Sequence, residues 1–265
     1  MNKISLLIAV YLGATIFLVY LPISHLILFS FNKISSLYYP FNGWSFKWYE
    51  AFIEDPAIII SLRNSIAQAI ITTIITVIAS TAAALAFRRR FRFQNPLFYI
   101  ILLGMIYPGV TLGLTNLIVD VQVLNLPLSI WTISFTLSVW CIPFGLIILL
   151  MRFDPKLSRY EEAARIHGAS EWKVFRNVTF PIIKTELIVV ALFAFTLALG
   201  EVFRSTFVSP PTSPVLPVLL LSTLASYPPT PKYFALGTVI AVVSLATILT
   251  GGAIMSRRGG LLVRK

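Results

Sequence analysis

Long apolar runs alternate with shorter polar segments along the whole chain. Six runs carry almost no charge, at about residues 5–30, 65–87, 97–119, 129–151, 184–208 and 233–255. A helix needs about 20 mostly apolar residues to cross the hydrocarbon of a bilayer. Lipid offers no hydrogen-bond partners to the backbone, so such runs cross as helices rather than as open strands. The pattern predicts an all-α, polytopic membrane protein with about six transmembrane helices, in a single transmembrane domain over residues 1–265.

The polar segments between the runs differ in charge. In a six-span arrangement, 16 of the 21 Lys and Arg residues fall on one side: Lys3, a cluster at 88–92, the segment 152–184 and the C-terminal tail. Positive loops stay on the cytoplasmic side of a membrane. We therefore expect both termini and the segment 152–183 to be cytoplasmic, and the protein to lie in the plasma or inner membrane.

Composition agrees with this class and limits the possible partners. The chain is 57% hydrophobic and 12% charged, with a mean hydropathy of +0.87. Its net charge of +11 is spread over segments next to the predicted spans. Contact with anionic membrane lipid accounts for such charge, so we expect lipid and no nucleic acid as a partner. The first run continues past the length of a signal-peptide core, and we expect an uncleaved first span.

Two of the connections have unusual compositions. The first, at about 31–64, is rich in aromatic residues, and its part 44–52 predicts a short amphipathic helix at the membrane interface or a docking surface for an external partner. The last connection, 209–232, contains seven prolines. These forbid one continuous helix, and the apolar stretch 215–224 between them predicts a re-entrant or interfacial helix.

Small residues mark candidate helix contacts inside the spans. Gly109 and Gly113 form a G-x-x-x-G pattern, and 80–84 is a run of Ser, Thr and Ala. Small side chains let transmembrane helices approach closely. The break Tyr107-Pro108-Gly109 is alternatively a hinge. Cys141 is the single cysteine, so no intrachain disulfide can form.

The segment 152–183 predicts two short helices joined by a turn. The first helix begins either at Asp154-Pro155, as an N-cap followed by proline, or at a capping box formed by Ser158 and Glu161. Its positions 160, 163, 164 and 167 share one mostly alanine face. That face is small enough to lie close against another surface. Arg159, Glu162 and Arg165 are spaced to form ion pairs.

The second helix of this segment follows a glycine turn. Gly168 permits the left-handed conformation that ends a helix, and Ser170 is placed to cap the next one. Pro181 is expected to close that second helix before the fifth span. The result predicts a helix-turn-helix beside the membrane.

The order Glu162-Ala163-Ala164, Gly168, Val178 and Phe180-Pro181 resembles the cytoplasmic loop of permease subunits of ABC importers. Similarity to the spermidine/putrescine type extends to Phe46–Tyr49, Arg88–Phe93, Phe195–Leu197 and Phe207-Val208. Two positions depart from the family pattern: His167 stands where aspartate is usual, and Phe180 where leucine is usual. The resemblance implies that Glu162, Ala163, Ala164, Gly168 and Pro181 form the ATPase-coupling site.

The same resemblance implies the partners and the mechanism. We expect a second permease, identical or paralogous, two ABC ATPase subunits and an extracytoplasmic substrate-binding protein, with transport by alternating access. The chain has no G-x-x-x-x-G-K-[ST] loop, because no glycine precedes a lysine. ATP and magnesium are therefore expected on the partner ATPase, with no cofactor on this chain. Catalytic and metal-ligand spacings are absent from the sequence, so no enzymatic activity is expected here.

Charged residues inside spans are functional candidates by default. Glu201 and Arg204 lie in the predicted fifth span, where they either pair with each other or face the substrate path. Asp120 and Asn116, at the end of the third span, are further path candidates. The resemblance favours a polyamine-like cargo, whereas Arg204 leaves another small organic or anionic solute open.

Two other functions compete with an ABC permease. A subunit of a secondary transporter driven by an ion gradient would need acidic residues inside the membrane, which Glu201 alone supports poorly. A membrane anchor or sensor would need no ATPase partner.

Overall fold

The computed structural model describes residues 3–153 and 155–262, and its regular elements in these ranges are helices joined by loops, with no strand. Five helices are long and apolar enough to cross a membrane, and a bent pair brings the number to six if it counts as one span. This confirms the all-α, polytopic class. The chain divides into two compact units, Met1–Ile60 with Leu219–Val243 and Ser61–Val218 with Ser244–Lys265, which are described separately.

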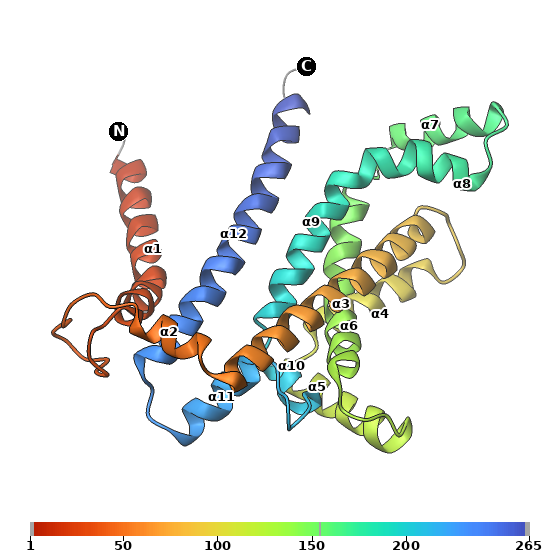
Figure 1. Ribbon diagram of the computed structural model, residues 1–265. Helices are drawn as coiled ribbons and strands as arrows, with labels where there is room; N and C mark the ends of the chain where they lie inside the picture. Colours follow the sequence, from red (N-terminus) through yellow and green to blue (C-terminus); the bar gives the residue numbers. More distant parts are fainter. Residues whose placement is uncertain (1–2, 154, 263–265) are drawn as a thin grey trace. The chain divides into compact units, whose positions relative to one another are not determined.

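Figure 1 shows the helices in chain order. Their bounds are α1 Lys3–Ser30, α2 Lys47–Ile53, α3 Pro56–Phe87, α4 Gln94–Ile106, α5 Gly109–Ile118, the π-helix η1 Val119–Val123, α6 Ile130–Leu150, α7 Pro155–Ile166, α8 Glu171–Val174, the π-helix η2 Phe175–Thr179, α9 Phe180–Leu199, α10 Phe203–Val208, α11 Leu216–Ser226 and α12 Pro231–Leu262. Three of the predicted spans need correction.

The second span begins earlier than its apolar run. The Asp55 carboxylate accepts hydrogen bonds from the backbone of Ala57 and Ile58, at 3.0 and 3.4 Å, and Pro56 is the first residue of α3. Aspartate at the N-cap followed by proline is a strong helix start. In the same unit Lys232 forms an ion pair with Asp55. The helix thus takes up residues that the hydropathy pattern assigned to the first connection.

The third span is bent rather than straight. The axes of Gln94–Ile106 and Gly109–Val123 differ by 104°. Tyr107, between them, is extended with ψ 130°, as expected for a residue that precedes proline. Pro108 lacks the N–H that would continue the helix. The uninterrupted span predicted at 97–119 is therefore wrong, because the break at Pro108 bends the chain.

The fifth span is interrupted as well. The helix α9 ends at Leu199, Gly200 leaves helical geometry, and α10 starts at Phe203. A continuous helix over 184–208 is therefore wrong. Glu201 lies in the break and Arg204 in the first turn of α10, so neither belongs to a regular span.

The first unit contains α1, α2 and an aromatic loop between them. Asn32 forms an antiparallel bridge with Trp44, and the Trp48 indole donates to the carbonyl of Asn32 at 2.6 Å. Phe31 packs against Trp44, Phe46 and Tyr49. The predicted amphipathic helix at 44–52 is present, but it begins at Lys47 because Trp44 and Ser45 are held in the loop by backbone bonds. The short helix predicted at 215–224 is present as α11.

The second unit is built on close contacts between α3, α6 and α9. Buried hydroxyl and amide side chains follow one stripe of α3: Ser61, Ser65, Gln68, Thr72, Thr76 and Ser80. The Ser134 hydroxyl of α6 donates to the carbonyl of Gln68 at 3.3 Å. At Gly145, a Cβ atom would meet the Ser80 hydroxyl at 2.7 Å. Small residues thus let α3 and α6 touch, as the small-residue run predicted.

Candidate functional site

The polar hairpin, defined here as α7, α8 and η2, has the local structure that its sequence predicts in most respects. The helix α7 begins with Pro155, and Asp154, the expected cap, lies outside the described residues. Gly168 has φ +80°, and the amide of Ala169 donates to the carbonyl of Ala164 at 3.1 Å. This is the left-handed turn that glycine favours. The Ser170 hydroxyl accepts from the amide of Lys173 at 3.4 Å and caps α8.

Two local predictions for the hairpin are wrong. Ser158 and Glu161 do not start a helix, because α7 already begins at Pro155. Pro181 does not close the second helix, since α8, η2 and α9 run on as one helical stretch, Glu171–Leu199. The amide of Phe180 donates to the carbonyl of Phe175, five residues back. The wider turn of this π-helix leaves room for the proline that follows.

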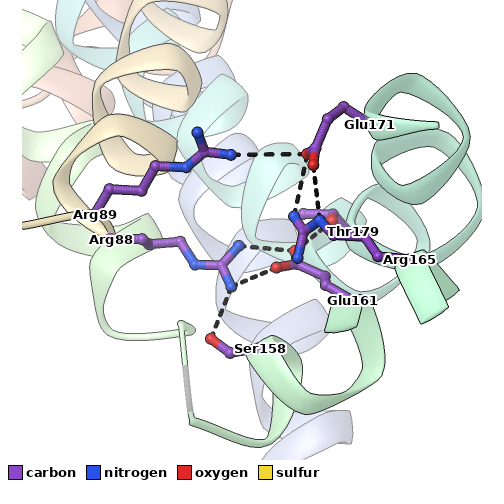
Figure 2. Close-up of polar contacts among 7 residues, drawn as sticks. All are labelled: Arg88, Arg89, Ser158, Glu161, Arg165, Glu171 and Thr179. Carbon is purple, nitrogen blue, oxygen red and sulfur yellow. Dashed lines mark hydrogen bonds and ion pairs between the residues drawn. The ribbon is translucent and has the colours of Figure 1, made fainter. Parts of the chain in front are cut away.

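Glu161 and Ser158 instead bind an arginine at the end of α3 (Figure 2). Arg88 Nη1 lies 2.8 Å from Glu161 Oε1, and Arg88 Nη2 lies 2.7 Å from Glu161 Oε2. Arg88 Nη2 also donates to Ser158 Oγ at 3.1 Å. The two side chains are only 14% and 7% exposed. Two parallel charge-assisted bonds fix orientation as well as distance.

A third group completes the binding of Glu161. The hydroxyl of Thr179, in η2, donates to Glu161 Oε1 at 2.5 Å. Burial by itself raises the pKa of the Glu161 carboxyl, but the hydrogen bonds from Arg88 and Thr179 and the charges of Arg88 and Arg165 outweigh it. The net pKa lies below its ordinary value. Glu161 is therefore a carboxylate at neutral pH.

A more exposed ion pair closes the hairpin on itself. Arg165 Nε and Nη2 donate to the two carboxylate oxygens of Glu171, at 2.7 and 3.1 Å. Arg165 was predicted to pair with Glu162 along the helix, and the structure gives it Glu171, across the turn, as its bonded partner. Figure 2 shows Arg89 reaching the same carboxylate, at a longer 3.7 Å.

A cleft of about 820 Å³ lies between these charges. Its walls come from the end of α3 and the segment after it, and from α7, α8 and η2. The lining combines four arginines with two glutamates and several apolar side chains: Leu85, Ala86, Arg88, Arg89, Arg90, Phe91, Ser158, Glu161, Arg165, Glu171, Val174, Phe175 and Thr179. The hairpin is thus joined to α3 by a polar, partly open contact.

The opposite side of α7 is not covered by the part of the chain that the structure describes. Glu162 and Ala163 are exposed, and Ala164 is half-buried. Two large apolar side chains lie in solvent nearby, Ile166 at 81% and Trp172 at 67% exposure. Large apolar side chains exposed on a polar hairpin, here one on α7 and one on α8, are typical of a surface that binds another protein. The candidate coupling residues therefore lie where a partner can reach them.

Glu201 and Arg204 form a buried pair. Arg204 Nη1 lies 3.1 Å from Glu201 Oε1, while Glu201 Oε2 accepts from the amides of Arg204 and Ser205 at 2.8 and 3.1 Å. The carboxylate thus caps α10 as well as balancing the guanidinium. Of the two alternatives given for Glu201 and Arg204, the structure contains the ion pair between them.

The same arginine braces the bend between α4 and α5. Arg204 Nη2 donates to the carbonyl of Tyr107 at 3.3 Å, and its guanidinium lies 4.1 Å from the centre of the Trp140 ring. At Gly113, a Cβ would meet Phe207 Cδ2 at 2.8 Å and the Arg204 carbonyl oxygen at 2.9 Å. The G-x-x-x-G pattern therefore marks a real contact, between α5 and α10.

The two remaining path candidates lie on the α5–η1 segment. Asn116 Nδ2 donates to Thr136 Oγ1 of α6 at 3.0 Å. Asp120 lies in η1, and its Oδ2 is buried without a hydrogen-bond partner among the described residues. Asp120 and Asn116 are not brought into contact with Glu201 or Arg204 by any described hydrogen bond or ion pair.

No grouping of His, Cys, Asp or Glu suited to a metal ion occurs among the residues described. Cys141 is a free cysteine, and its side chain is buried.

The family model for the "Binding-protein-dependent transport system inner membrane component" matches residues 74–258. The chain belongs to this family. It is therefore a multi-pass membrane permease of an ABC importer, as the loop resemblance predicted. The matched range contains the polar hairpin and both broken spans. Nothing in the comparisons favours the alternative of a secondary transporter.

Two named relatives are similar in sequence to this chain over most of its length. The putrescine transport system permease protein PotI of Escherichia coli (strain K12) is 30% identical over 212 residues, which cover 77% of this chain and 75% of the relative. The spermidine/putrescine transport system permease protein PotC of Haemophilus influenzae is 28% identical over 231 residues, covering 87% and 89%. Both are named as permease proteins of transport systems.

Solved structures show the same fold. A bacterial ABC transporter involved in the import of the acidic polysaccharide alginate matches with a TM-score of 0.67 at 20% identity, over 99% of this chain and 96% of the other. The same kind of transporter, in complex with an alginate pentasaccharide-bound periplasmic protein, matches with a TM-score of 0.65 at 19% identity. At this identity the likeness concerns the arrangement of the helices.

Sequence reasoning missed the partner of Glu161 and the neighbours of Arg204. It treated Arg88 as one charge of a basic cluster and Glu161 as part of a helix start. One signal was available: Glu161 is one of few acids in a strongly basic segment, next to an arginine cluster at a span end. The contacts of Arg204 with Tyr107 and Trp140 join residues distant in sequence and leave no such local signal.

Proposed function

We propose that this chain is one of two permeases in an importer that is powered by two separate ABC ATPase subunits and supplied by an extracytoplasmic substrate-binding protein. ATP and magnesium would bind to the ATPases, and this chain would carry no cofactor. The family and the absence of a phosphate-binding loop in the sequence support this division. The second permease is either a copy of this chain or a paralogue.

The polar hairpin is proposed to be the part that contacts an ATPase. The observation that carries this proposal is the two-sided character of α7. One side is anchored to the end of α3 through Arg88 and Glu161, and the other presents Glu162 and Ala163 to solvent. In this function Gly168 shapes the turn, and Pro181 follows the π-helix that leads into α9. Closure of the ATPases would move the hairpin, and the spans would open alternately to the two sides.

A charge reversal on the exposed side of α7 tests this contact. We expect Glu162→Lys to reduce the amount of ATPase that co-purifies with the tagged permease, because it places a new charge in the docking surface without touching the anchored side. Glu54→Lys is the matched control, since Glu54 is also exposed but lies before α3, in the first connection. Equal recovery of ATPase with both variants would refute the docking role of the hairpin.

The cargo is proposed to be a small polyamine-like solute. The relatives named for putrescine and spermidine support this class. Glu201 is not the proposed ligand, because both of its oxygens are bound. Asp120, with a buried oxygen that lacks a partner in the described part of the chain, is the proposed path carboxylate, with Asn116 one turn before it. A carboxylate suits an ammonium group.

Two measurements address the cargo. Calorimetry of the cognate binding protein should give heat with putrescine or spermidine, and not with sugars or phosphonates. In vesicles that contain the whole transporter, Asp120→Asn should lower uptake of labelled putrescine while assembly is kept. Binding of an anionic solute alone would exclude the polyamine class and leave the proposed permease role intact.

A further inference from the structure

We infer that Arg88 is a positioning residue for ATP-coupled transport, which holds α7 to the end of α3 so that movement of the hairpin moves the second span. The inference rests on the proposed function, in which the hairpin receives force from an ATPase. It adds to that function a specific contact, called the joint here, which is formed by Arg88, Ser158, Glu161 and Thr179. These residues lie outside the predicted coupling site.

The position of Arg88 in the chain makes it suitable for this role. It directly follows Phe87, the last residue of α3, so its backbone moves with that helix. Phe87 is packed into an apolar cluster with Ala84, Leu146 and Val190, and its carbonyl accepts a hydrogen bond from Gln94 Nε2 at 2.8 Å. The end of α3 is thus held on both sides, and Arg88 projects from a fixed point.

The contact made by Arg88 is directional and multiple. Both outer nitrogens bind the Glu161 carboxylate, one of them also binds Ser158, and the guanidinium lies 4.7 Å from the centre of the Phe153 ring. Thr179 holds the same carboxylate from η2. Four segments therefore meet at one ion pair: the end of α3, the segment after α6, α7 and η2.

Burial keeps this joint closed. Both partners are largely shielded from water, and opening the pair would leave an uncompensated charge in that environment. A long exposed pair, such as Arg89 with Glu171 at 3.7 Å, has no such penalty. Of these two arginines, Arg88 therefore forms the pair that resists separation when the hairpin moves.

The two sides of α7 give the joint its direction. Leu157, Glu161 and Arg165 are spaced by four and form the anchored side, on which Leu157 and Glu161 are buried. Glu162 and Ile166 are exposed on the other side. Force applied by a partner to the exposed side therefore passes across one helix diameter to the pair with Arg88.

The functional test uses the whole transporter in liposomes, with both permeases, both ATPases and the binding protein purified with its cargo bound. Arg88→Lys keeps the charge but loses the two parallel bonds. Arg92→Lys is the matched control, because Arg92 is exposed, does not line the cleft and makes no ion pair described in this structure. We expect Arg88→Lys to assemble and to hydrolyse ATP, while stimulation of hydrolysis by the binding protein falls about three- to thirty-fold. Equal stimulation in the two variants would overturn the inference.

A structural readout covers the case in which a variant fails to assemble. Spin labels on cysteines introduced at Ile78 of α3 and Ile166 of α7, both exposed, report the distance between the two helices in the full chain alone. The distance distribution should be narrow in the parent and in Arg92→Lys, and broad in Arg88→Lys and Glu161→Gln. A narrow distribution in all four shows that other contacts position α7, and the inference is then wrong. Because this measurement needs no ATPase, it stands or falls separately from the docking of Glu162.

Discussion

Ion pairs in this chain differ in burial, and burial decides how much each one contributes at the level of the residue. Arg88–Glu161 and Arg204–Glu201 are largely shielded from water, whereas Arg89–Glu171 is mostly exposed. Exposed pairs contribute about 0–1 kcal/mol. A buried pair can be neutral overall compared with an apolar pair, but removal of one partner costs about 3–5 kcal/mol. The buried pairs therefore fix geometry, and they make single substitutions there severe.

The lowered pKa of Glu161 predicts a dependence of stability on pH. A carboxyl with a lower pKa in the folded state contributes stability above its unfolded pKa and loses that contribution as the pH falls through the folded pKa. Glu161→Gln should therefore lower the melting temperature in detergent at pH 7. The difference from the parent should shrink once the pH lies below the ordinary carboxyl range. Thermal unfolding of both proteins across this range checks the prediction, and a difference that is constant with pH would contradict it.

Among the helices, the two broken spans depend on each other. Pro108 bends α4 from α5, Gly200 separates α9 from α10, and the resulting short helices α5 and α10 pack together. Arg204 reaches the carbonyl of Tyr107 at the bend. A broken helix exposes backbone groups that must find partners inside the membrane, and here the charged side chain from one break satisfies the other.

Substitution at Gly113 tests this contact. A Cβ there would lie 2.9 Å from a backbone oxygen of Arg204, which cannot move as a flexible side chain can. Gly113→Ala should destabilise the protein by about 1–3 kcal/mol, as overpacking does. Gly252→Ala is the control, because nothing lies within 4 Å of its added Cβ, and alanine favours the helix there. A thermal shift no larger for Gly113→Ala than for Gly252→Ala would show that α5 and α10 do not depend on this glycine.

Helices and local caps could be predicted from the sequence because their causes are local. Hydropathy located the spans, Gly168 and Ser170 gave the turn, and the small residues near Ser80 gave a helix contact. The start of α3 at Asp55-Pro56 has a local cause as well, but it lies outside the apolar run that marks the span. The bend angle at Pro108 and the partner of Glu161 could not be predicted in this way. They depend on how a proline or an ion pair is used by the fold, and the residues that make such contacts are up to 97 positions apart, as Arg204 and Tyr107 are.

For the molecule as a whole, the distribution of apolar side chains fits a protein surrounded by lipid and other subunits. The window of α1 that could span a membrane has none of its residues buried, and the corresponding windows of α3 and α12 have 28% and 22% buried. Only α6, at 56%, is mostly enclosed. Apolar helices with such exposure are stable when lipid or another apolar helix covers them. This agrees with a permease whose spans complete their packing outside the single chain.

The charge distribution makes a prediction about orientation that needs no knowledge of the cargo. With 16 of 21 basic residues on one side of the six-span arrangement, the positive-inside bias predicts that the polar hairpin and both termini are cytoplasmic. A cysteine introduced at Arg90 should be protected from a membrane-impermeant maleimide in intact cells and should react after lysis. A cysteine at Tyr38, which is 82% exposed in the aromatic loop, should react in intact cells. The native Cys141 is 1% exposed and provides little background. Labelling of the Arg90 position and not of the Tyr38 position in intact cells would contradict this orientation and would place the hairpin out of reach of a cytoplasmic ATPase.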